Sequence, residues 1–263
     1  MNAERRRREV VATLARDGEV TVTDLARRFT VSEMTVRRDL EALEGQGTVR
    51  RVRGGAITAV SRAYEPPLAL RSTEAAPAKQ AIGRAAAALI ADGETAVIDV
   101  GTTTLELARA LRGRRGVTIV TPSLLVAAEL GHEPDMRVLL TGGWLRPGEM
   151  SLVGTAAEEV FAAVNCDVAF IGVAGIDVTK GITEYNLDDT RVKRAAMASA
   201  RRSVVLADAT KCGRVAFATV APLADVDVLV TDAADDEPVT RALTDQGAEV
   251  VRVPMEKVED KPQ

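Results

Sequence analysis

The sequence predicts an α/β protein of two domains, a small N-terminal helical domain with a basic β-wing and a larger three-layer domain around a parallel sheet. Three observations support this class. Residues 1–58 hold short helical patterns followed by an arginine- and glycine-rich segment. From residue 78 onward, short β-branched runs alternate with helical stretches, which is typical of a parallel sheet covered on both faces. A length of 263 residues also exceeds what one small module needs.

The chain opens with a helical pattern over Asn2–Asp17, which Gly18 ends. The apolar residues expected to face inward are Val10, Val11 and Leu14. Four consecutive arginines, at 5–8, lie in the same helix. They are either a solvated helix end or a contact to phosphate, and the sequence leaves both alternatives open.

Two short helices separated by a turn are expected next. Thr23 is the predicted N-cap of the first and Ser32 of the second, because a hydroxyl there accepts a hydrogen bond from a free backbone N–H. The residues expected to face the core are Leu25, Ala26, Phe29, Val36, Leu40 and Leu43. At 100° per residue, the outer side of the second helix carries Met34, Arg37, Arg38 and Glu41, with Thr35 beside them.

A basic two-stranded wing is predicted after the second helix. Gly45 and Gly47 end that helix, and the segment 48–53 reads TVRRVR before Gly54 and Gly55. Arginine contacts phosphates or guanine edges, so the outer helix face suits the DNA major groove and the wing suits the DNA backbone. The alternative is a helical unit whose arginines form a solvated face. The residues expected at DNA are Thr23, Ser32, Thr35, Arg37, Arg38, Arg50, Arg51 and Arg53.

This stretch resembles the N-terminal winged helix-turn-helix of the DeoR family of bacterial transcription regulators. The matching residues are Leu25, Phe29, Val31, Ser32, Thr35 to Leu40, Leu43 and Arg53 to Ala56. The resemblance implies that the segment from Val20 to Asp39 is the helix-turn-helix proper and that double-stranded operator DNA is the partner.

Composition limits the other classes. Residues 1–60 hold twelve arginines and nine acidic residues, a net charge of +3, whereas the remainder holds 22 basic and 29 acidic residues, a net charge of −7. A mildly basic head on an acidic body fits a protein that touches DNA at one end. Cys166, Cys212 and a single His lack metal-ligand spacing, so no metal or cofactor is expected. No signal peptide or membrane-spanning run is visible, which predicts a cytoplasmic protein.

The second half of the chain alternates predicted helices and strands. A proline-containing segment at 61–77, with Pro66 and Pro67, is expected to separate it from the head and to include a short helix from Leu68. The predicted strands are 95–100, 117–120, 137–140, 167–173, 203–207, 227–230 and 249–253. The predicted helices are 78–90, 103–111, 123–130, 156–163, 188–200 and 238–246.

Glycine, hydroxyl, acidic and lysine residues follow several of these strands. In such sheets ligands bind beyond the carboxyl ends of the strands. The loop Gly101 to Thr104 opens a helix, and free backbone N–H groups with three hydroxyls suit an anion such as phosphate. An ordinary strand-to-helix turn is the alternative, but Ser123 and Lys211 on the same rim favour phosphate. Lys193 pairs either with phosphate or with Asp189, four residues earlier.

The same positions resemble the C-terminal sensor domain of the DeoR family. The matches are Asp99, Gly101, Thr102, Thr103, Gly142, Gly143, Gly181 to Thr183, Lys193, Asp208 and Lys211. The resemblance implies a fold similar to ribose-5-phosphate isomerase and glucosamine-6-phosphate deaminase, with a phosphorylated sugar or related metabolite as effector. The family often has Asn between Thr121 and Ser123. Here Pro122 removes an amide side chain and a backbone N–H from the rim.

The sequence therefore predicts a winged helix-turn-helix domain at 1–58, a linker at 59–77, an effector-sensing α/β domain at 78–255 and a polar tail at 256–263. The predicted function is a homo-oligomeric transcription regulator of sugar metabolism genes that a phosphorylated sugar releases from its operator. The resemblance alone implies that it represses, since no residue decides between repression and activation. The alternatives are a sugar-phosphate isomerase- or deaminase-like enzyme with a DNA-binding head, and an adaptor whose head binds protein. The expected effector residues are Asp99, Gly101, Thr102, Thr103, Thr104, Thr121, Ser123, Gly142, Gly143, Lys193, Asp208 and Lys211.

Overall fold

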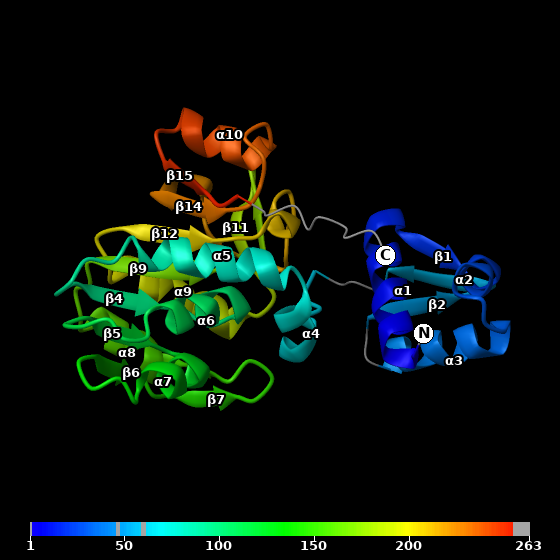
Figure 1. Ribbon diagram of the computed structural model, residues 1–263, viewed down its shortest axis with the longest axis horizontal. Helices are drawn as coiled ribbons and strands as arrows, with labels where there is room; N and C mark the ends of the chain where they lie inside the picture. Colours follow the sequence, from blue (N-terminus) through cyan, green and yellow to red (C-terminus); the bar gives the residue numbers. More distant parts are fainter. Residues whose placement is uncertain (1, 46–47, 59–61, 255–263) are drawn as a thin grey trace, which may run out of the picture. The chain divides into compact units, whose positions relative to one another are not determined.

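A computed structural model of the chain describes residues 2–45, 48–58 and 62–254 (Figure 1). It divides into two compact units, Met1–Pro66 and Pro67–Gln263. The segment assigned to a linker at 59–77 contains a helix, α4 (Leu68–Thr73), and the next helix begins at Ala76. The tail expected at 256–263 lies outside the described residues. Within the described residues, no helix has both the length and the apolar composition needed to cross a membrane.

Three helices and a small antiparallel sheet make up the first unit. Its elements are α1 (Ala3–Asp17), β1 (Glu19–Thr21), α2 (Val22–Phe29), α3 (Glu33–Gly45), β2 (Val49–Val52) and β3 (Gly55–Thr58). The sheet order is β1-β3-β2, so the wing is a hairpin to which an unpredicted strand, β1, is added. The inward faces of α1, α2 and α3 form one core, and the predicted Val10, Leu14, Leu25, Val36 and Leu40 are all buried.

Of the two predicted N-caps, Ser32 is confirmed and Thr23 is not. Asn2 accepts a hydrogen bond from Arg5 N and caps α1, and Ser32 Oγ accepts one from Thr35 N at the start of α3. Thr23 is not the N-cap of α2. Thr21 takes that place and accepts from Asp24 N, because β1 occupies the residues just before it and α2 starts at Val22.

The second unit is a parallel sheet between two layers of helices. Its helices are α4, α5 (Ala76–Ala87), α6 (Thr102–Ala110), α7 (Leu124–Leu130), α8 (Thr155–Ala162), α9 (Leu187–Ala198) and α10 (Pro238–Asp245). The main strands are β4 (Thr95–Ile98), β5 (Thr118–Thr121), β6 (Arg137–Leu140), β9 (Val168–Gly172), β12 (Ser203–Leu206), β14 (Val228–Thr231) and β15 (Glu249–Arg252). Every one of these strands overlaps a predicted strand.

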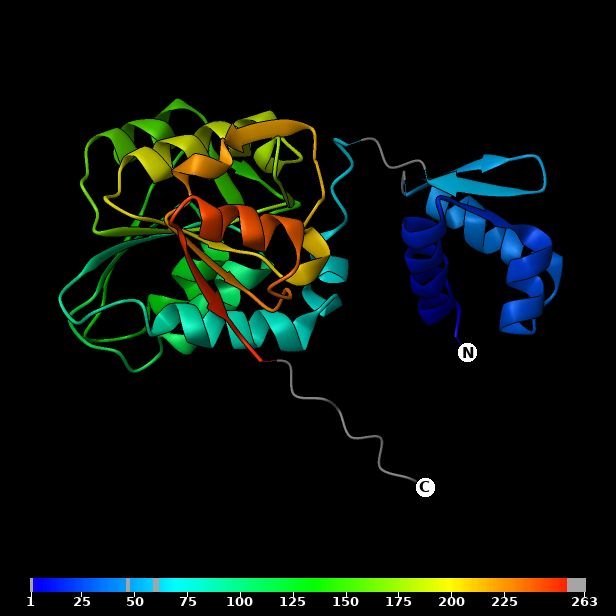
Figure 2. The ribbon, with the colours of Figure 1, turned by 90° about the horizontal axis from the view of Figure 1, so that it is seen from above.

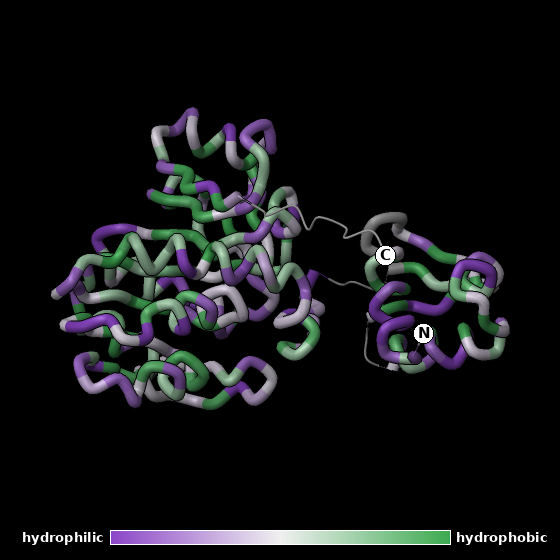
Figure 3. Tube along the Cα trace, viewed as in Figure 1, coloured by the Kyte–Doolittle hydropathy of each residue, from purple (hydrophilic) through white to green (hydrophobic). Residues whose placement is uncertain are grey.

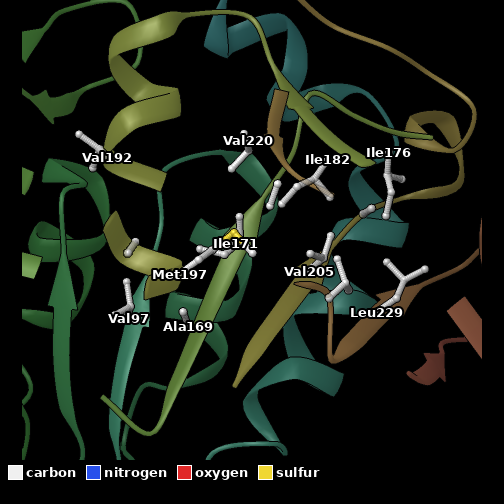
Figure 4. Packing of buried hydrophobic residues seen from close by; sticks show 14 of the residues in the cluster. Val97, Ala169, Ile171, Ile176, Ile182, Val192, Met197, Val205, Val220 and Leu229 are labelled. Carbon is white, nitrogen blue, oxygen red and sulfur yellow. The ribbon is translucent and has the colours of Figure 1, made fainter. Parts of the chain in front are cut away.

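The seven strands lie in the order β15-β14-β12-β9-β4-β5-β6, and every neighbouring pair is parallel. Figure 2 shows the sheet between its two helical layers. Alternate residues of a strand serve opposite faces: Val97 joins the cluster that includes residues of α8, α9 and α10, and Ile98 joins the cluster that includes residues of α5, α6 and α7. Figure 4 shows Val97 and Ile171 in the first of these clusters, with Met197 of α9.

Five short strands of the second unit were not predicted from the sequence. They are β7 (Trp144–Arg146), β8 (Ser151–Val153), β10 (Gly175–Asp177), β11 (Gly181–Glu184) and β13 (Ala218–Ala221). They form a two-stranded ribbon and a separate antiparallel sheet in the order β10-β11-β13. Figure 3 shows that apolar stretches follow the strands of the main sheet, whereas the loops are polar. Trp144 is an exception to burial, since 81% of it is exposed on β7.

Candidate functional sites

The outer face of α3 carries the side chains predicted at DNA. Arg37 and Arg38 are exposed, and Thr35 is half-buried at the start of the helix. Arg37 makes a long ion pair with Glu33, at 3.4 Å, whereas Arg38 has no acidic partner among the described residues. An exposed cation without a carboxylate partner needs no internal bond to be broken before it meets a phosphate or a base edge.

Helix α3 is held in place by α1. Asp39 is buried, and its two carboxylate oxygens accept from Arg6 Nε at 2.5 Å and from Arg7 Nε at 3.0 Å. Two members of the arginine run at 5–8 therefore hold the buried side of α3 rather than forming only a solvated helix end. The sequence pattern did not predict this contact, because Asp39 lies 33 residues from Arg6 and 32 residues from Arg7.

The wing presents two arginines freely and uses a third locally. Arg51 donates from both its backbone N and its Nε to the carboxylate of Glu44, at 3.0 and 2.6 Å. Arg50 and Arg53 are exposed. Thr23, which is not a cap, donates to Glu33 at 3.0 Å. Of the eight predicted residues, Arg38, Arg50 and Arg53 are thus the most available for DNA.

In the second unit, the site lies where the strand order reverses. Strands β4, β5 and β6 follow one another toward one edge, whereas β9, β12, β14 and β15 follow one another toward the other. The reversal falls between β4 and β9, and ligands of open α/β sheets bind beyond the carboxyl ends at such a point. Asp99 follows β4 there, and Gly172 ends β9 beside it. Gly172 N donates to Asp99 Oδ2 at 3.1 Å.

Lys193 of α9 lies fully buried beside these two residues. Its ammonium donates to Asp99 and to the Gly172 carbonyl, at 2.9 Å for the latter, and forms an ion pair of 3.3 Å with Glu184. Burial opposes its charge, but the carboxylates of Asp99 and Glu184 outweigh burial and raise the pKa of Lys193. These partners occupy the Lys193 ammonium and favour an indirect role through Asp99, so its direct contact with phosphate stays a prediction. In the part of the chain that the structure describes, Lys193 and Asp189 do not form an ion pair, although the Asp189 carboxylate also helps to raise the pKa of Lys193.

Asp189 belongs to a different network. It accepts from Ser151 Oγ at 2.9 Å and pairs with Arg146 at 2.7 Å, so the ribbon β7–β8 ties down the start of α9. Asn186 caps the same helix through the backbone N–H groups of Asp188 and Asp189. These bonds fix the position of Lys193 one turn further along.

The loop Gly101 to Thr104 forms the predicted helix start. Gly101 has a φ of 126°, which favours glycine, and its carbonyl accepts from Thr104 Oγ1 at 3.0 Å and from Leu105 N at 3.1 Å. Within the described residues, no hydrogen bond uses the backbone N–H groups of Thr102, Thr103 or Thr104. The start of α6 therefore offers three N–H donors and the positive end of a helix dipole.

A lysine that sequence reasoning missed joins this rim. Lys79 of α5 is only 2% exposed, and its ammonium donates to the Arg71 carbonyl. Burial lowers the pKa of Lys79, the carboxylate of Asp208 opposes that change, and the charge of Lys211 adds to it. Lys211 is buried too and has a distant partner in Glu74, at 4.0 Å. Two buried ammonium groups with such weak compensation favour an anionic ligand.

A glycine explains how Lys79 reaches the rim. A Cβ on Gly83 would lie 2.5 Å from the backbone carbon of Glu106, so α5 and α6 cross at van der Waals contact only because this residue has no side chain. Lys79 lies one turn before Gly83 and Thr102 lies one turn before Glu106. The contact thus carries the lysine toward the first turn of α6. The sequence pattern predicts only a helix over 78–90 and gives no signal for this contact.

Asp99 and Asp208 each keep one carboxylate oxygen unused. Within the described residues, Asp99 Oδ1 and Asp208 Oδ2 are buried and have no hydrogen-bond partner. Asp208 Oδ1 accepts from Thr210 N at 3.1 Å. The two residues follow β4 and β12, which are the strands on either side of β9. They therefore flank the end of β9, at Gly172. Carboxylate oxygens repel phosphate but accept from hydroxyl groups.

The remaining predicted effector residues form hydrogen bonds with the backbone or allow close backbone contacts. Thr121 Oγ1 donates to the Ile98 carbonyl at 2.6 Å and accepts from Ser123 N at 3.1 Å, and Ser123 Oγ caps α7. Gly143 passes so close to Val153 that a Cβ would lie 2.5 Å from the Val153 carbonyl oxygen. Gly142 also has positive φ. The Pro122 carbonyl accepts from Leu152 N at 2.8 Å, which joins β8 to this loop.

The structure supplies little support for metal or thiol chemistry. No group of three or more His, Cys, Asp or Glu able to hold a metal occurs among the described residues. Burial and the neighbouring Glu237 raise the pKa of Cys212 to about 12, so its thiolate is scarce at neutral pH. His132 lies exposed in the turn after α7.

Comparison with known proteins matches both units. The model of the DeoR-like helix-turn-helix domain matches residues 6–62, and that of the DeoR C terminal sensor domain matches residues 74–233. The uncharacterized HTH-type transcriptional regulator YgbI of Escherichia coli K12 is 36% identical over 92% of this chain and 94% of its own. The glycerol-3-phosphate regulon repressor of the same strain is 32% identical over 93% and 97%.

Two other comparisons complete these findings. The HTH-type transcriptional regulator GlpR of Haloferax volcanii is 35% identical over 95% of this chain and 97% of its own. Among solved structures, ribose 5-phosphate isomerase A of Methanocaldococcus jannaschii superposes with a TM-score of 0.38 at 17% identity, over 51% of this chain. This chain spans about half of the isomerase, 52%.

Proposed function

This chain belongs to the DeoR family of helix-turn-helix transcriptional regulators, and from that membership we propose that it represses genes of carbohydrate metabolism and that a phosphorylated sugar metabolite releases it from its operator. Relatives of nearly the same length are named as regulators, one of them as the repressor of a glycerol-3-phosphate regulon. The observation that carries the proposal is that one chain has both a set of buried lysines in its second unit and an exposed basic helix face in its first unit.

The proposed operator contact begins with α3. Arg38 and Arg37 contact base edges or phosphates in the major groove, with Thr35 at the helix start. Arg50 and Arg53 of the wing contact the backbone, and Arg51 joins them once its bond with Glu44 is exchanged for a phosphate. Thr23 and Ser32 lie at the starts of the two helices, where backbone N–H groups also meet phosphates.

In the proposed effector site, cations and backbone N–H groups bind the phosphate, and carboxylates bind the sugar. The phosphate lies at the start of α6, on the N–H groups of Thr102 to Thr104, with the ammonium groups of Lys79 and Lys211 beside it. Asp99 Oδ1 and Asp208 Oδ2 accept from hydroxyls of the sugar. Lys193 acts indirectly by orienting Asp99. Thr121, Ser123, Gly142 and Gly143 shape the neighbouring loop, and any direct contact from them remains a prediction.

Release follows from linkage between the two functions. The effector weakens operator binding only if it binds the released state more tightly than the operator-bound state. The experiment is an operator shift with the full chain and its own upstream DNA, titrated with sugar phosphates and their unphosphorylated parents. Release by one phosphate and not by its parent supports the proposal. Operator binding that every phosphate leaves unchanged contradicts the effector assignment and leaves the DNA assignment standing.

The proposal includes a homo-oligomer in the cytoplasm. A helix-turn-helix dimer binds two half-sites related by two-fold symmetry, so paired heads raise operator affinity. Within the second unit, the edge strand β6 and the ribbon strand β7 expose Leu139, Leu140, Trp144 and Leu145. Apolar residues along an unpaired edge are unusual for a monomer. Light scattering of the full chain tests the assembly, and a monomeric mass at micromolar concentration contradicts it.

We further propose that the effector leaves the site unchanged, so that the chain is a sensor and not an isomerase or deaminase. Asp99 Oδ2 is engaged by Lys193 and by Gly172 N, and we assign the other oxygen, Oδ1, to binding a sugar hydroxyl. Incubation of the purified chain with pentose and hexosamine phosphates, followed by product analysis, tests this. Turnover that Asp99→Asn abolishes contradicts it.

A further inference from the structure

Tyr185 has a buried hydroxyl with no partner. The residue directly follows β11 and is only 4% exposed, yet its hydroxyl makes no hydrogen bond within the described residues. Its ring packs with Ala174 and Ala216, and the guanidinium of Arg214 lies 5.4 Å from the ring centroid. A desolvated hydroxyl that lacks a partner is unfavourable, and such groups are rare unless a ligand or water completes them.

The segment that carries Arg214 is fixed against the sheet that carries Tyr185. Gly213 N donates to the Ile176 carbonyl at 2.8 Å, and Ala216 N donates to Thr183 Oγ1 at 2.9 Å. A Cβ on Gly175 would lie 2.3 Å from the Arg214 carbonyl oxygen, so glycine is required for this approach. Arg214 is therefore positioned by backbone contacts, and no carboxylate pairs with its guanidinium within the described residues.

The hydroxyl belongs to the effector rim. Arg71 and Glu74, which neighbour the ammonium groups of Lys79 and Lys211, also act on Tyr185 electrostatically. The preceding residue, Glu184, holds Lys193 and through it Asp99. Arginines and glutamates thus act on the hydroxyl with opposing signs, so the field favours neither a second phosphate nor an ammonium group. It suits a neutral oxygen, as in a hydroxyl or carbonyl group.

We propose that Tyr185 and Arg214 determine specificity in the effector site, by binding a neutral hydroxyl or carbonyl oxygen of the phosphorylated effector outside its phosphate. The inference rests on the proposed function, because it assumes that a phosphorylated metabolite occupies the rim. Lys79, Lys211 and the start of α6 then supply affinity common to all phosphates. Tyr185 distinguishes among sugar phosphates, since a buried hydroxyl rejects a ligand that offers it no partner.

The test is calorimetric titration of the full chain with inorganic phosphate and with a panel of pentose, hexose and hexosamine phosphates. Tyr185→Phe removes only the hydroxyl. It is expected to weaken the best-bound sugar phosphate roughly 5- to 30-fold and to leave inorganic phosphate unchanged. Arg214→Gln is expected to act in the same direction. Tyr64→Phe is the matched control, because Tyr64 lies in the other unit and its hydroxyl is bound to Thr48 at 2.6 Å.

A second readout separates this role from a structural one. If the hydroxyl serves the ligand, its loss leaves the melting temperature of the ligand-free chain unchanged or higher, because an unpaired buried group disappears. A lower melting temperature, an unchanged affinity for the sugar phosphate, or an equal loss for inorganic phosphate overturns the inference while the proposed function stands. If the wild type binds an unphosphorylated sugar alone and Tyr185→Phe loses it, the phosphate assignment fails and the role of Tyr185 survives. If no probe binds, both fail.

Discussion

Arg6 of α1 and Asp39 of α3 form a buried ion pair, with Nε and Oδ2 2.5 Å apart, on the side of α3 opposite to the proposed DNA contacts. Arg7 holds the other carboxylate oxygen at 3.0 Å. The pair joins the beginning of the chain to the helix that we assign to the operator. It also separates two kinds of arginine in this unit, those that orient α3 and those that remain for DNA.

Asp39→Ala is expected to destabilise the first unit by about 3–5 kcal/mol, because removal of one partner leaves a buried guanidinium without its carboxylate. Urea unfolding followed by circular dichroism measures this loss. Glu33→Gln is the control, since its pair with Arg37 is exposed and contributes less than about 1 kcal/mol. Equal effects of the two substitutions would show that the Arg6–Asp39 pair is no more important than a surface pair.

Arg38→Ala is expected to weaken operator binding by about 1–3 kcal/mol while the fold survives, because an exposed arginine is removed from the outer face of α3. Fluorescence anisotropy with labelled operator, at low and moderate salt, measures the change. Arg27→Ala removes an exposed arginine of α2 that pairs with Asp24 and serves as the control. An affinity unaltered by Arg38→Ala at both salt concentrations would remove our assignment of this face.

Lys79→Met is expected to raise the sugar-phosphate concentration needed for operator release at least about tenfold, since a hydrogen bond to a charged group contributes about 1.5–3 kcal/mol. Operator binding without effector should persist, because Lys79 belongs to the second unit. Lys180→Met replaces an exposed lysine in the turn before β11 and is the control. A normal response from Lys79→Met would place the phosphate elsewhere on the rim.

The pH dependence of stability gives an independent check on Lys79. Burial lowers the pKa of Lys79 in the folded chain below the ordinary 10.5 of the unfolded chain. At pH values between the folded and the unfolded pKa, the unfolded chain therefore binds more protons than the folded chain. The free energy of unfolding contributed by this group therefore rises with pH through that window and levels off above 10.5. Lys79→Met should be more stable than the wild type at neutral pH, and the difference should shrink as the pH approaches 10.5. Denaturant titrations at several pH values test the sign.

Much of the fold could be read from local patterns. The strands at 137–140 and 203–207 and the helices on both sides of the sheet follow from β-branched runs and 3.6-residue periodicity, because burial on two faces requires such runs. The ribbon β7–β8 was missed because each strand has three residues, and neither shows an alternating pattern: β7 is largely exposed, whereas all of β8 is buried. Trp144 lies outside the core, exposed on that ribbon.

The candidate sites divide in the same way. The sequence by itself determined the family, the helix-turn-helix and the loop Gly101 to Thr104, since each is a contiguous stretch whose chemistry depends on near neighbours. Only the tertiary structure decided that Lys79 joins the rim, that Lys193 is enclosed by carboxylates, and that Tyr185 lacks a partner. Those facts depend on contacts between residues far apart in the chain, where burial and pairing set each charge, and no local pattern records them.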